Sequence, residues 1–420
     1  MRRDALLARL LGWLPPGRAS RRFLVVFFID SVGTGLFLAG SALFFTRVIG
    51  LSSAEVGLGL SLSAVAGLVC SVPLGRIADR FGTRRTVVGV YLWRGAGFLA
   101  YLFVDDVAGF IAVACALGIG QWTIGPLVQA MVGASEEGPS RVRTMAAMNA
   151  VRNSGFVIGA LLGTLAIAAD SATGYRALVV GDALSFFFAA ALLARSPAVA
   201  ARAAAHDASE AVVRVVDLRY LALAAANGVL FLHHVLLGVG LPLWIATRTE
   251  APATLVGAVV LLNTVLAITL GVRLSRGADG LLAGGARQHW AGWSLAACCG
   301  LLALTAHAGP VAASVLLLGA AAVLTLGELW QSLGAWGLSY ALSPEDRRGY
   351  YLTVYNLGEP VASIVGPIVL TVAVMEAGAT GWLCLAVLFA LTGLGVRAIA
   401  RRAAAPERGP ALVPATDGRA

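Results

Sequence analysis

Six ionisable side chains interrupt the long apolar runs of this 420-residue chain, and they are its strongest candidates for chemistry. A charged group inside a membrane-spanning helix costs about 3 kcal/mol by insertion scales, so its presence favours a functional role. Such a group can exchange a proton, pair with an opposite charge or bind a charged solute. The six are Asp30, Arg94, Arg152, Asp182, Glu328 and Glu359.

Asp30 and Arg94 lie at matching depths. Each stands about eight residues into its apolar run, which at 1.5 Å per residue places both roughly 12 Å deep. Two interpretations stay open. Asp30 can bind and release a proton, with Arg94 or a cationic substrate competing for it, or the two can form a static ion pair. Asp182 is expected nearer the outer surface, as a solvated or capped carboxylate.

The elements that carry these residues are twelve apolar runs, each close to the roughly 20 residues that cross a bilayer as a helix. The sequence predicts an all-α polytopic membrane protein with two six-helix bundles around a central cavity. The expected spans are 22–46, 54–74, 86–104, 107–132, 144–168, 176–194, 220–246, 253–272, 287–307, 310–335, 350–374 and 380–398.

Composition supports this class and excludes others. The chain is 59% hydrophobic and only 13% charged, against about 25% charged in soluble domains. It contains no lysine and therefore no G-x-x-x-x-G-K-[ST] loop, and it has no H-E-x-x-H motif, so we expect neither an ATPase nor another enzyme. The net charge of +9 is spread over short loops, which argues against a nucleic-acid partner. The five cysteines lie in apolar runs and are expected to pack as small hydrophobic residues.

Arginine placement predicts the orientation. With the N-terminus inside, 26 of the 31 arginines fall in cytoplasmic segments and three in outer loops, as the positive-inside rule requires. Both termini are then cytoplasmic. The predicted organisation is a cytoplasmic N-terminal segment (1–21), a first bundle (22–194), a cytoplasmic linker (195–219), a second bundle (220–398) and a cytoplasmic, disordered tail (399–420).

The two halves repeat each other. The segment from Met148 to Thr164 aligns with the segment from Tyr355 to Thr371 at one constant spacing, and Gly120-Gln121 aligns with Gly327-Glu328 at the same spacing. Arg152 and Glu359 are therefore repeat mates of opposite charge. Pro360, next to Glu359, should bend its helix.

The most specific segment is Gly75-Arg-Ile-Ala-Asp79-Arg80-Phe-Gly82-Thr-Arg84-Arg85, a basic turn between the second and third runs. Its pattern G-x-x-x-D-R-x-G-x-R-R resembles the loop between helices 2 and 3 of the major facilitator superfamily, most like bacterial drug and metabolite exporters. In that family the acid and the arginines clamp helix ends across the two halves and favour the outward-open state. The resemblance assigns this gate to Gly75, Asp79, Arg80, Gly82, Arg84 and Arg85.

The same resemblance implies that spans 1, 4, 7 and 10 line the cavity. Gln121 and Glu328 then face it, and a carboxylate near indole rings suits a lipophilic cation. The expected cavity residues are Gln121, Trp122, Trp330, Gln331 and His233. Proton coupling or ion pairing is assigned to Asp30, Arg94, Glu328, Glu359 and Arg152. The alternatives are helix–helix hydrogen bonds and structural pairs.

Glycines are expected to let helices approach closely. Gly155, Gly159 and Gly163 lie on one face of span 5, which partly resembles the glycine-proline signature of proton-coupled exporters, without its proline. The second half keeps Gly366-Pro367. The adjacent His233 and His234 point about 100° apart on a helix, which argues against a metal site, and Pro242 is expected to kink their helix.

The sequence thus predicts a monomeric, proton-coupled exporter of small amphipathic or cationic compounds in a bacterial cytoplasmic membrane. Its partners would be substrate, protons and lipid, with the proton gradient in place of a cofactor. The alternatives are an importer of a small metabolite or nutrient, and a membrane sensor or scaffold that transports nothing.

Overall fold

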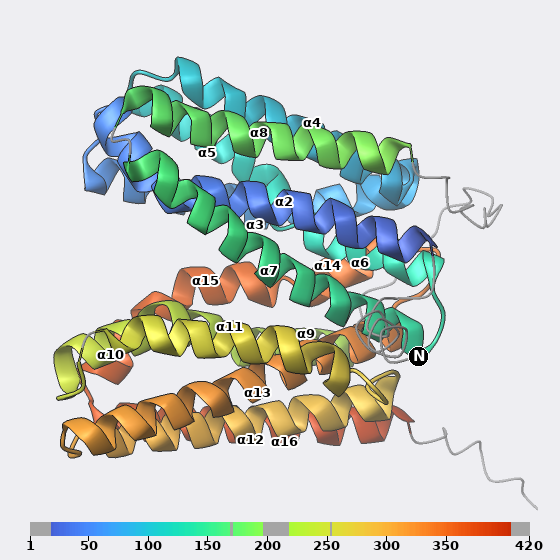
Figure 1. The fold of residues 1–420 in the computed structure, drawn as a ribbon. Helices are drawn as coiled ribbons and strands as arrows, with labels where there is room; N and C mark the ends of the chain where they lie inside the picture. The colour runs from blue at the N-terminus through green and yellow to red at the C-terminus, as the bar shows by residue number, and fades with distance from the viewer. Residues whose placement is uncertain (1–17, 169–170, 196–217, 253, 405–420) are drawn as a thin grey trace, which may run out of the picture.

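The first half of the chain forms one bundle of long helices. A computed structural model describes residues 18–168, 171–195, 218–252 and 254–404. The helices of the first bundle run roughly along one direction (Figure 1). They are α2 (Arg18–Leu43) with η1 (Phe44–Val48), α3 (Ser53–Phe81), α4 (Thr83–Ala100) with η2 (Tyr101–Phe103), α5 (Val107–Gln121), α6 (Ile124–Ser135), α7 (Pro139–Ala168) and α8 (Ala172–Ala194).

The second half forms a similar bundle beside the first (Figure 1). Its helices are α9 (Leu218–Val235) with η3 (Leu236–Gly240), α10 (Leu241–Arg248), α11 (Leu255–Leu274), α12 (Leu281–Thr305), α13 (Pro310–Leu342), α14 (Arg348–Tyr355), α15 (Gly358–Ile368) with η4 (Val369–Met375), and α16 (Ala379–Ala404).

Each of the twelve predicted spans corresponds to one helix or to one interrupted helix, so the all-α, two-bundle fold is confirmed. In the described residues, nine helices are long and apolar enough to cross a membrane by length and composition alone. Large apolar side chains such as Val69, Leu165 and Leu391 lie exposed on the outside, where lipid can cover them. Most of the predicted segments 1–21, 195–219 and 399–420 lies outside the described residues.

Prolines explain where helices break. The span predicted as 107–132 is two helices separated at Trp122. The break is caused by Pro126, which lacks an N–H and whose ring conflicts with the carbonyl of Trp122 four residues earlier. Pro360 stands in the same relation to Asn356, where α14 ends, so the predicted bend is confirmed as a break. A π-helical turn, η3, precedes Pro242, which confirms the predicted irregularity in that span.

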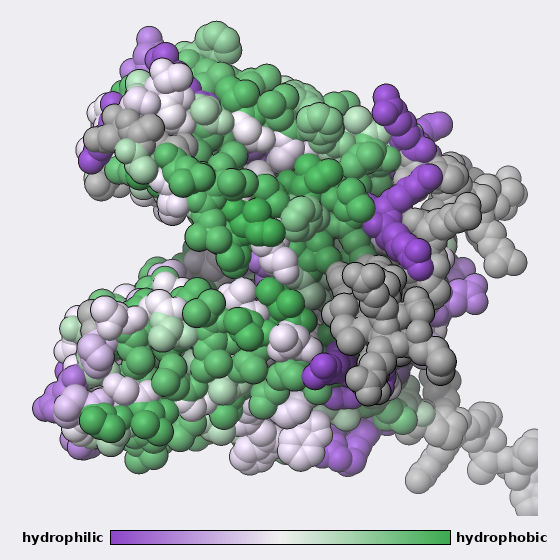
Figure 2. All heavy atoms as spheres, in the orientation of Figure 1, coloured by the Kyte–Doolittle hydropathy of each residue, from purple (hydrophilic) through white to green (hydrophobic). Residues whose placement is uncertain are grey.

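In the described residues the bundles meet towards one end. That end, here called the arginine-rich end, holds the turn at Gly82 and the N-terminus of α14, and there α14 packs against α3 and α6 of the other half (Figure 1). Figure 2 shows a deep cleft between the bundles that opens at the opposite end, where α10 lies. In the described part of the chain the cleft therefore opens at the end where α10 lies.

Candidate functional site

The arginine-rich end is closed by a carboxylate that caps a helix of the other half. Asp79, in the last turn of α3, accepts hydrogen bonds from the backbone N–H groups of Gly349 (2.9 Å) and Tyr350 (2.8 Å) in the first turn of α14. These N–H groups have no partner within their own helix, and the positive end of the helix dipole faces the carboxylate. Asp79 thus joins the two halves directly.

Two glycines permit this approach. A Cβ atom on Gly75 would lie 2.9 Å from Thr353 Oγ1, and one on Gly349 would lie 2.4 Å from Asp79 Oδ1. Gly75 of the predicted gate is therefore placed where α3 and α14 come together. Any larger side chain would push the helices apart.

Other contacts across this end were not foreseen. The side-chain amide of Gln129 on α6 donates a hydrogen bond to Ser339 Oγ (2.8 Å). The backbone carbonyl of Gln129 accepts one from the Tyr340 hydroxyl (2.7 Å). Arg348, 9% exposed, donates to the Gly133 carbonyl (3.0 Å). The sequence predicted no role for Arg348, because hydrogen bonds to backbone carbonyls leave no sequence pattern.

Arg80 and Arg84 of the gate turn contact their own half, whereas the Arg76 guanidinium lies 5.2 Å from the centroid of the Tyr350 ring in the other half. The Arg84 guanidinium donates to the Leu193 carbonyl (3.1 Å) and to that of Ala194, so it caps the C-terminus of α8. The Arg80 guanidinium lies 5.4 Å from the centroid of the Phe81 ring. Gly82, with φ of 94°, occupies a backbone conformation that side chains disfavour, which explains its place between α3 and α4.

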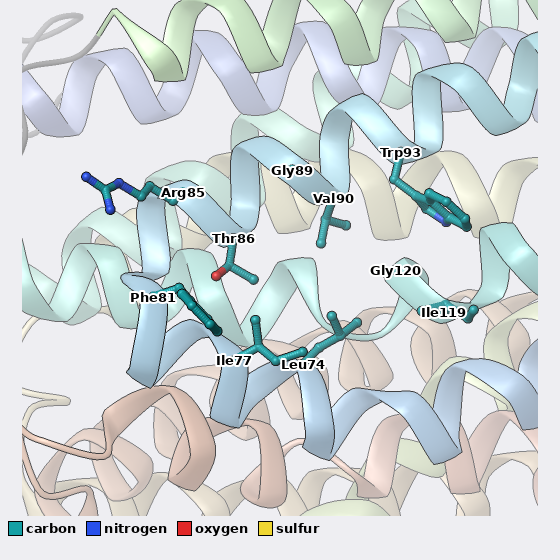
Figure 3. A pocket seen from close by; sticks show the side chains of 10 residues that line it. All are labelled: Leu74, Ile77, Phe81, Arg85, Thr86, Gly89, Val90, Trp93, Ile119 and Gly120. Carbon is teal, nitrogen blue, oxygen red and sulfur yellow. The ribbon is translucent and has the colours of Figure 1, made fainter. Parts of the chain in front are cut away.

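Arg85 belongs to a different surface. It lines an apolar pocket of α3, α4 and α5, and its guanidinium points away from the apolar side chains (Figure 3). The pocket includes Trp93, which is half exposed, so it lies on an outer face of the first bundle. It contains none of the charged residues of the interior.

The interior of the first bundle holds a cluster of charges. Asp30 on α2 is half-buried, and its Oδ1 is buried without a hydrogen-bond partner in the described residues. Arg94 exerts the strongest electrostatic effect of any cation on Asp30, but no ion pair joins them within the described chain. The Arg94 guanidinium instead lies 4.3 Å from the centroid of the Phe186 ring. The hydroxyl of Tyr91 is buried nearby, also without a partner.

Asp182 joins this cluster, which corrects its predicted place near the outer surface. It is only 1% exposed, and it interacts electrostatically with Arg94 and Asp30. The prediction was wrong because α8 begins at Ala172, four residues before the expected start, which moves Asp182 towards the middle of the helix. Gly33 makes room for it, since a Cβ there would lie 2.8 Å from Asp182 Oδ1.

Arg152 links this cluster electrostatically to the second half. It lies exposed on α7, and its charge acts on Asp30, on Glu359 and on His234. Glu359 stands in the first turn of α15, where a carboxylate also meets the positive end of the helix dipole. No ion pair between Arg152 and Glu359 is present among the described residues, and their role in proton coupling or ion pairing stays a prediction.

The second bundle holds several buried polar side chains that hydrogen-bond across helices. Glu328, 6% exposed on α13, accepts a hydrogen bond from Asn263 Nδ2 on α11 (2.8 Å). Gln331, one turn further along α13, donates to Asn227 Oδ1 (2.7 Å), as does Gln288 (2.7 Å). His233, fully buried at the end of α9, lies within electrostatic range of Glu328.

The remaining predicted cavity residues have mixed surroundings. Gln121 ends α5 and is exposed, whereas Trp122 packs against Gly67 of α3. Trp330 lies near Trp290 of α12, with ring centroids 6.4 Å apart, and Trp290 is half exposed. An indole–carboxylate site formed by Trp330 and Glu328 therefore has no support from these contacts.

The glycine face of α7 packs on α2. Cβ atoms on Gly155, Gly159 and Gly163 would lie 2.0–2.8 Å from atoms of α2, mostly backbone carbonyl oxygens. In the second half, a Cβ on Gly366 would lie 2.7 Å from Val235 Cγ2, which brings α15, with its Pro367, close to α9. These glycines thus allow close packing of α7 on α2 and of α15 on α9.

Two six-helix bundles with a cleft between them, joined at one end by a carboxylate of the first half, are typical of a membrane transporter fold. Residues 23–367 match the Major Facilitator Superfamily, and the chain belongs to that family. The family and the fold are those of transporters and not of enzymes.

Individual similarities are modest. The chain is 26% identical to an uncharacterised MFS-type transporter of Methanocaldococcus jannaschii over 35% of this chain and 39% of that protein. It is 29% identical to multidrug resistance protein MdtH of Aeromonas hydrophila over 29% of this chain and 30% of that protein. The alignments thus span between about a third and two fifths of these relatives. The fold is similar to that in a crystal structure of a bacterial homologue of the iron transporter ferroportin in an outward-facing state. The TM-score is 0.67, and the sequences are 14% identical over 92% of this chain and 99% of that one.

Proposed function

We propose that this protein exports small amphipathic or cationic compounds across a bacterial cytoplasmic membrane in exchange for protons, by alternating access. The arginine-rich end then faces the cytoplasm, as the positive-inside rule favours, and the cleft opens outward. The protein would act as a monomer and would draw its energy from the proton gradient alone.

The charge cluster of the first bundle carries this proposal. Asp30 and Asp182 both interact with Arg94, so these three groups together carry a net charge of −1 when all are ionised and become neutral when they bind one proton. Uncompensated charge is costly in a low-dielectric interior, so proton binding and release should alter the stability of this packing. The cluster therefore suits a site for one exchanged proton.

Arg152 supplies a connection between that proton and the cleft. It is exposed and acts electrostatically on Asp30 in one half and on Glu359 in the other. A cationic substrate near Glu359 would compete with Arg152, and Arg152 would then interact more strongly with Asp30 and favour release of its proton. The relatives named multidrug resistance proteins support export as the direction of transport.

The test is accumulation of lipophilic fluorescent cations in a bacterium without its own efflux pumps. Cells with the wild-type protein should accumulate less dye, and a protonophore or Asp30→Asn should abolish the difference at matched expression. Glu376→Gln, a carboxylate at the opening end of the cleft, is the control and should behave as wild type. Higher accumulation than in empty cells would indicate an importer. No flux of any dye or metabolite, in cells or liposomes, would favour a sensor or scaffold.

A further inference from the structure

Two adjacent histidines and a carboxylate converge inside the second bundle. One ligand atom from each of His233, His234 and Glu328 can be chosen so that all three lie within 4.8 Å of one another. The two imidazole centroids are 4.4 Å apart with an angle of 34° between the rings. Their positions on the helix alone argued against a metal site, but the side-chain conformations bring both rings to the same side.

His233 is oriented as a ligand. Its Nδ1 lies 2.8 Å from the Leu230 carbonyl oxygen, which can only accept, so Nδ1 carries the proton and Nε2 carries a lone pair. That Nε2 is buried and has no hydrogen-bond partner within the described residues. A hydrogen bond from the far ring nitrogen to a carbonyl is how proteins orient metal-binding histidines. This nitrogen is therefore available to bind a ligand.

Glu328 and His234 are held in place as well. Asn263 donates to Glu328 Oε2, which leaves Oε1 without a hydrogen bond in the described part of the chain. The His234 ring stacks on Phe231, with centroids 4.5 Å apart. His234 is the least buried of the three, so an ion can reach the cluster from its side.

We propose that His233, His234 and Glu328 bind one divalent first-row transition-metal cation, such as Zn²⁺ or Co²⁺. Imidazole nitrogen and carboxylate oxygen are ligands these ions accept, whereas Ca²⁺ and Mg²⁺ require oxygen ligands throughout. Bond lengths of about 2.0 Å in a tetrahedral site place ligand atoms about 3.3 Å apart, so closure from 4.8 Å needs movements of about 1.5 Å at most. Three protein ligands leave a fourth position for water or a solute.

The charges permit such an ion. Two neutral imidazoles and one carboxylate carry −1, and a divalent ion changes this to +1. Arg152 opposes the ion, but Glu359, which also interacts with Arg152, partly offsets that charge. Metal binding at this site can be measured separately from the proposed proton-coupled export, since the charge cluster for protons lies in the other half.

The experiment is Co²⁺ titration of the purified full chain in detergent, followed by the visible absorption of tetrahedral cobalt. The protein should carry a non-histidine tag, because a histidine tag would itself bind cobalt. We expect one Co²⁺ per chain, displaced by Zn²⁺ and not by Mg²⁺. Glu328→Gln and His234→Ala should weaken binding at least tenfold, and Asn263→Ala by about 10- to 100-fold through loss of orientation.

His307→Ala is the matched control, since this histidine is exposed and outside the cluster, and it should bind cobalt as wild type does. Size-exclusion chromatography identifies variants that fail to fold. His234, which is only partly buried, is the variant least at risk of misfolding. Absence of cobalt absorption in a monodisperse wild-type protein, or equal affinity in folded His234→Ala, would overturn the assignment. Dye export can be measured separately, so the two proposals can fail independently.

Discussion

Removal of the Asp79 carboxylate should shift the protein away from the state with the cleft open at the α10 end. In Asp79→Ala both hydrogen bonds from the first turn of α14 are lost, and two N–H groups are left without partners. Hydrogen bonds to a charged group contribute about 1.5–3 kcal/mol each, and the low end applies because Asp79 is only half-buried. The loss is therefore about 3 kcal/mol, which is a factor of roughly 100 in the equilibrium between conformations.

Asp79→Asn should have a smaller effect, because the amide oxygen can still accept one of the two bonds. Asp346→Asn is the control. Its carboxylate lies near the same helix end but pairs with Arg347 in its own half, so the equilibrium should not change.

The assay is a distance measurement between spin labels at positions 105 and 250, in a variant without the five native cysteines. Both positions are exposed, and they lie in different halves at the open end of the cleft. Wild type should show mainly the long distance of the open cleft, and Asp79→Ala mainly a shorter one. An unchanged distance distribution in folded Asp79→Ala would refute the conclusion that this carboxylate holds the arginine-rich end closed.

Three further outcomes are expected. Gly159→Ala should lower the melting temperature, because its Cβ would lie 2.0 Å from the Val32 carbonyl oxygen and overpacking costs about 1–3 kcal/mol. Gly57→Ala is the control and should be neutral or stabilising, because a Cβ at Gly57 would have no atom within 4 Å. Equal changes in melting temperature for the two variants would contradict the packing argument. Arg348→Ala should shift the same spin-label distances as Asp79→Ala, through loss of the bond to Gly133, whereas the more exposed Arg347→Ala should not. Asp182→Asn should abolish dye-driven proton flux in proteoliposomes while dye binding persists; retained flux would remove Asp182 from the proton site.

The sequence was sufficient to predict the architecture. Apolar runs of bilayer length dictate helices, because backbone groups in lipid must bond within their own segment, and the repeat from Met148 and Tyr355 divides the helices into two halves. Pro360 and Pro242 were sufficient to predict irregular helices, because the missing backbone N–H of a proline disturbs the helix locally. The motif around Asp79 predicted a gate by resemblance alone.

The partners of each buried group required the tertiary structure. Asp79 binds backbone N–H groups 270 residues away, and backbone groups leave no trace in a sequence. Asp182 was misplaced because an error of one helical turn in a boundary moves a side chain by about 5 Å along the axis. His233 and His234 looked divergent on an ideal helix, but side-chain rotation and the approach of α13 bring their nitrogens near Glu328. Sequence thus determined which charges enter the membrane, whereas packing of distant helices decided which of them meet.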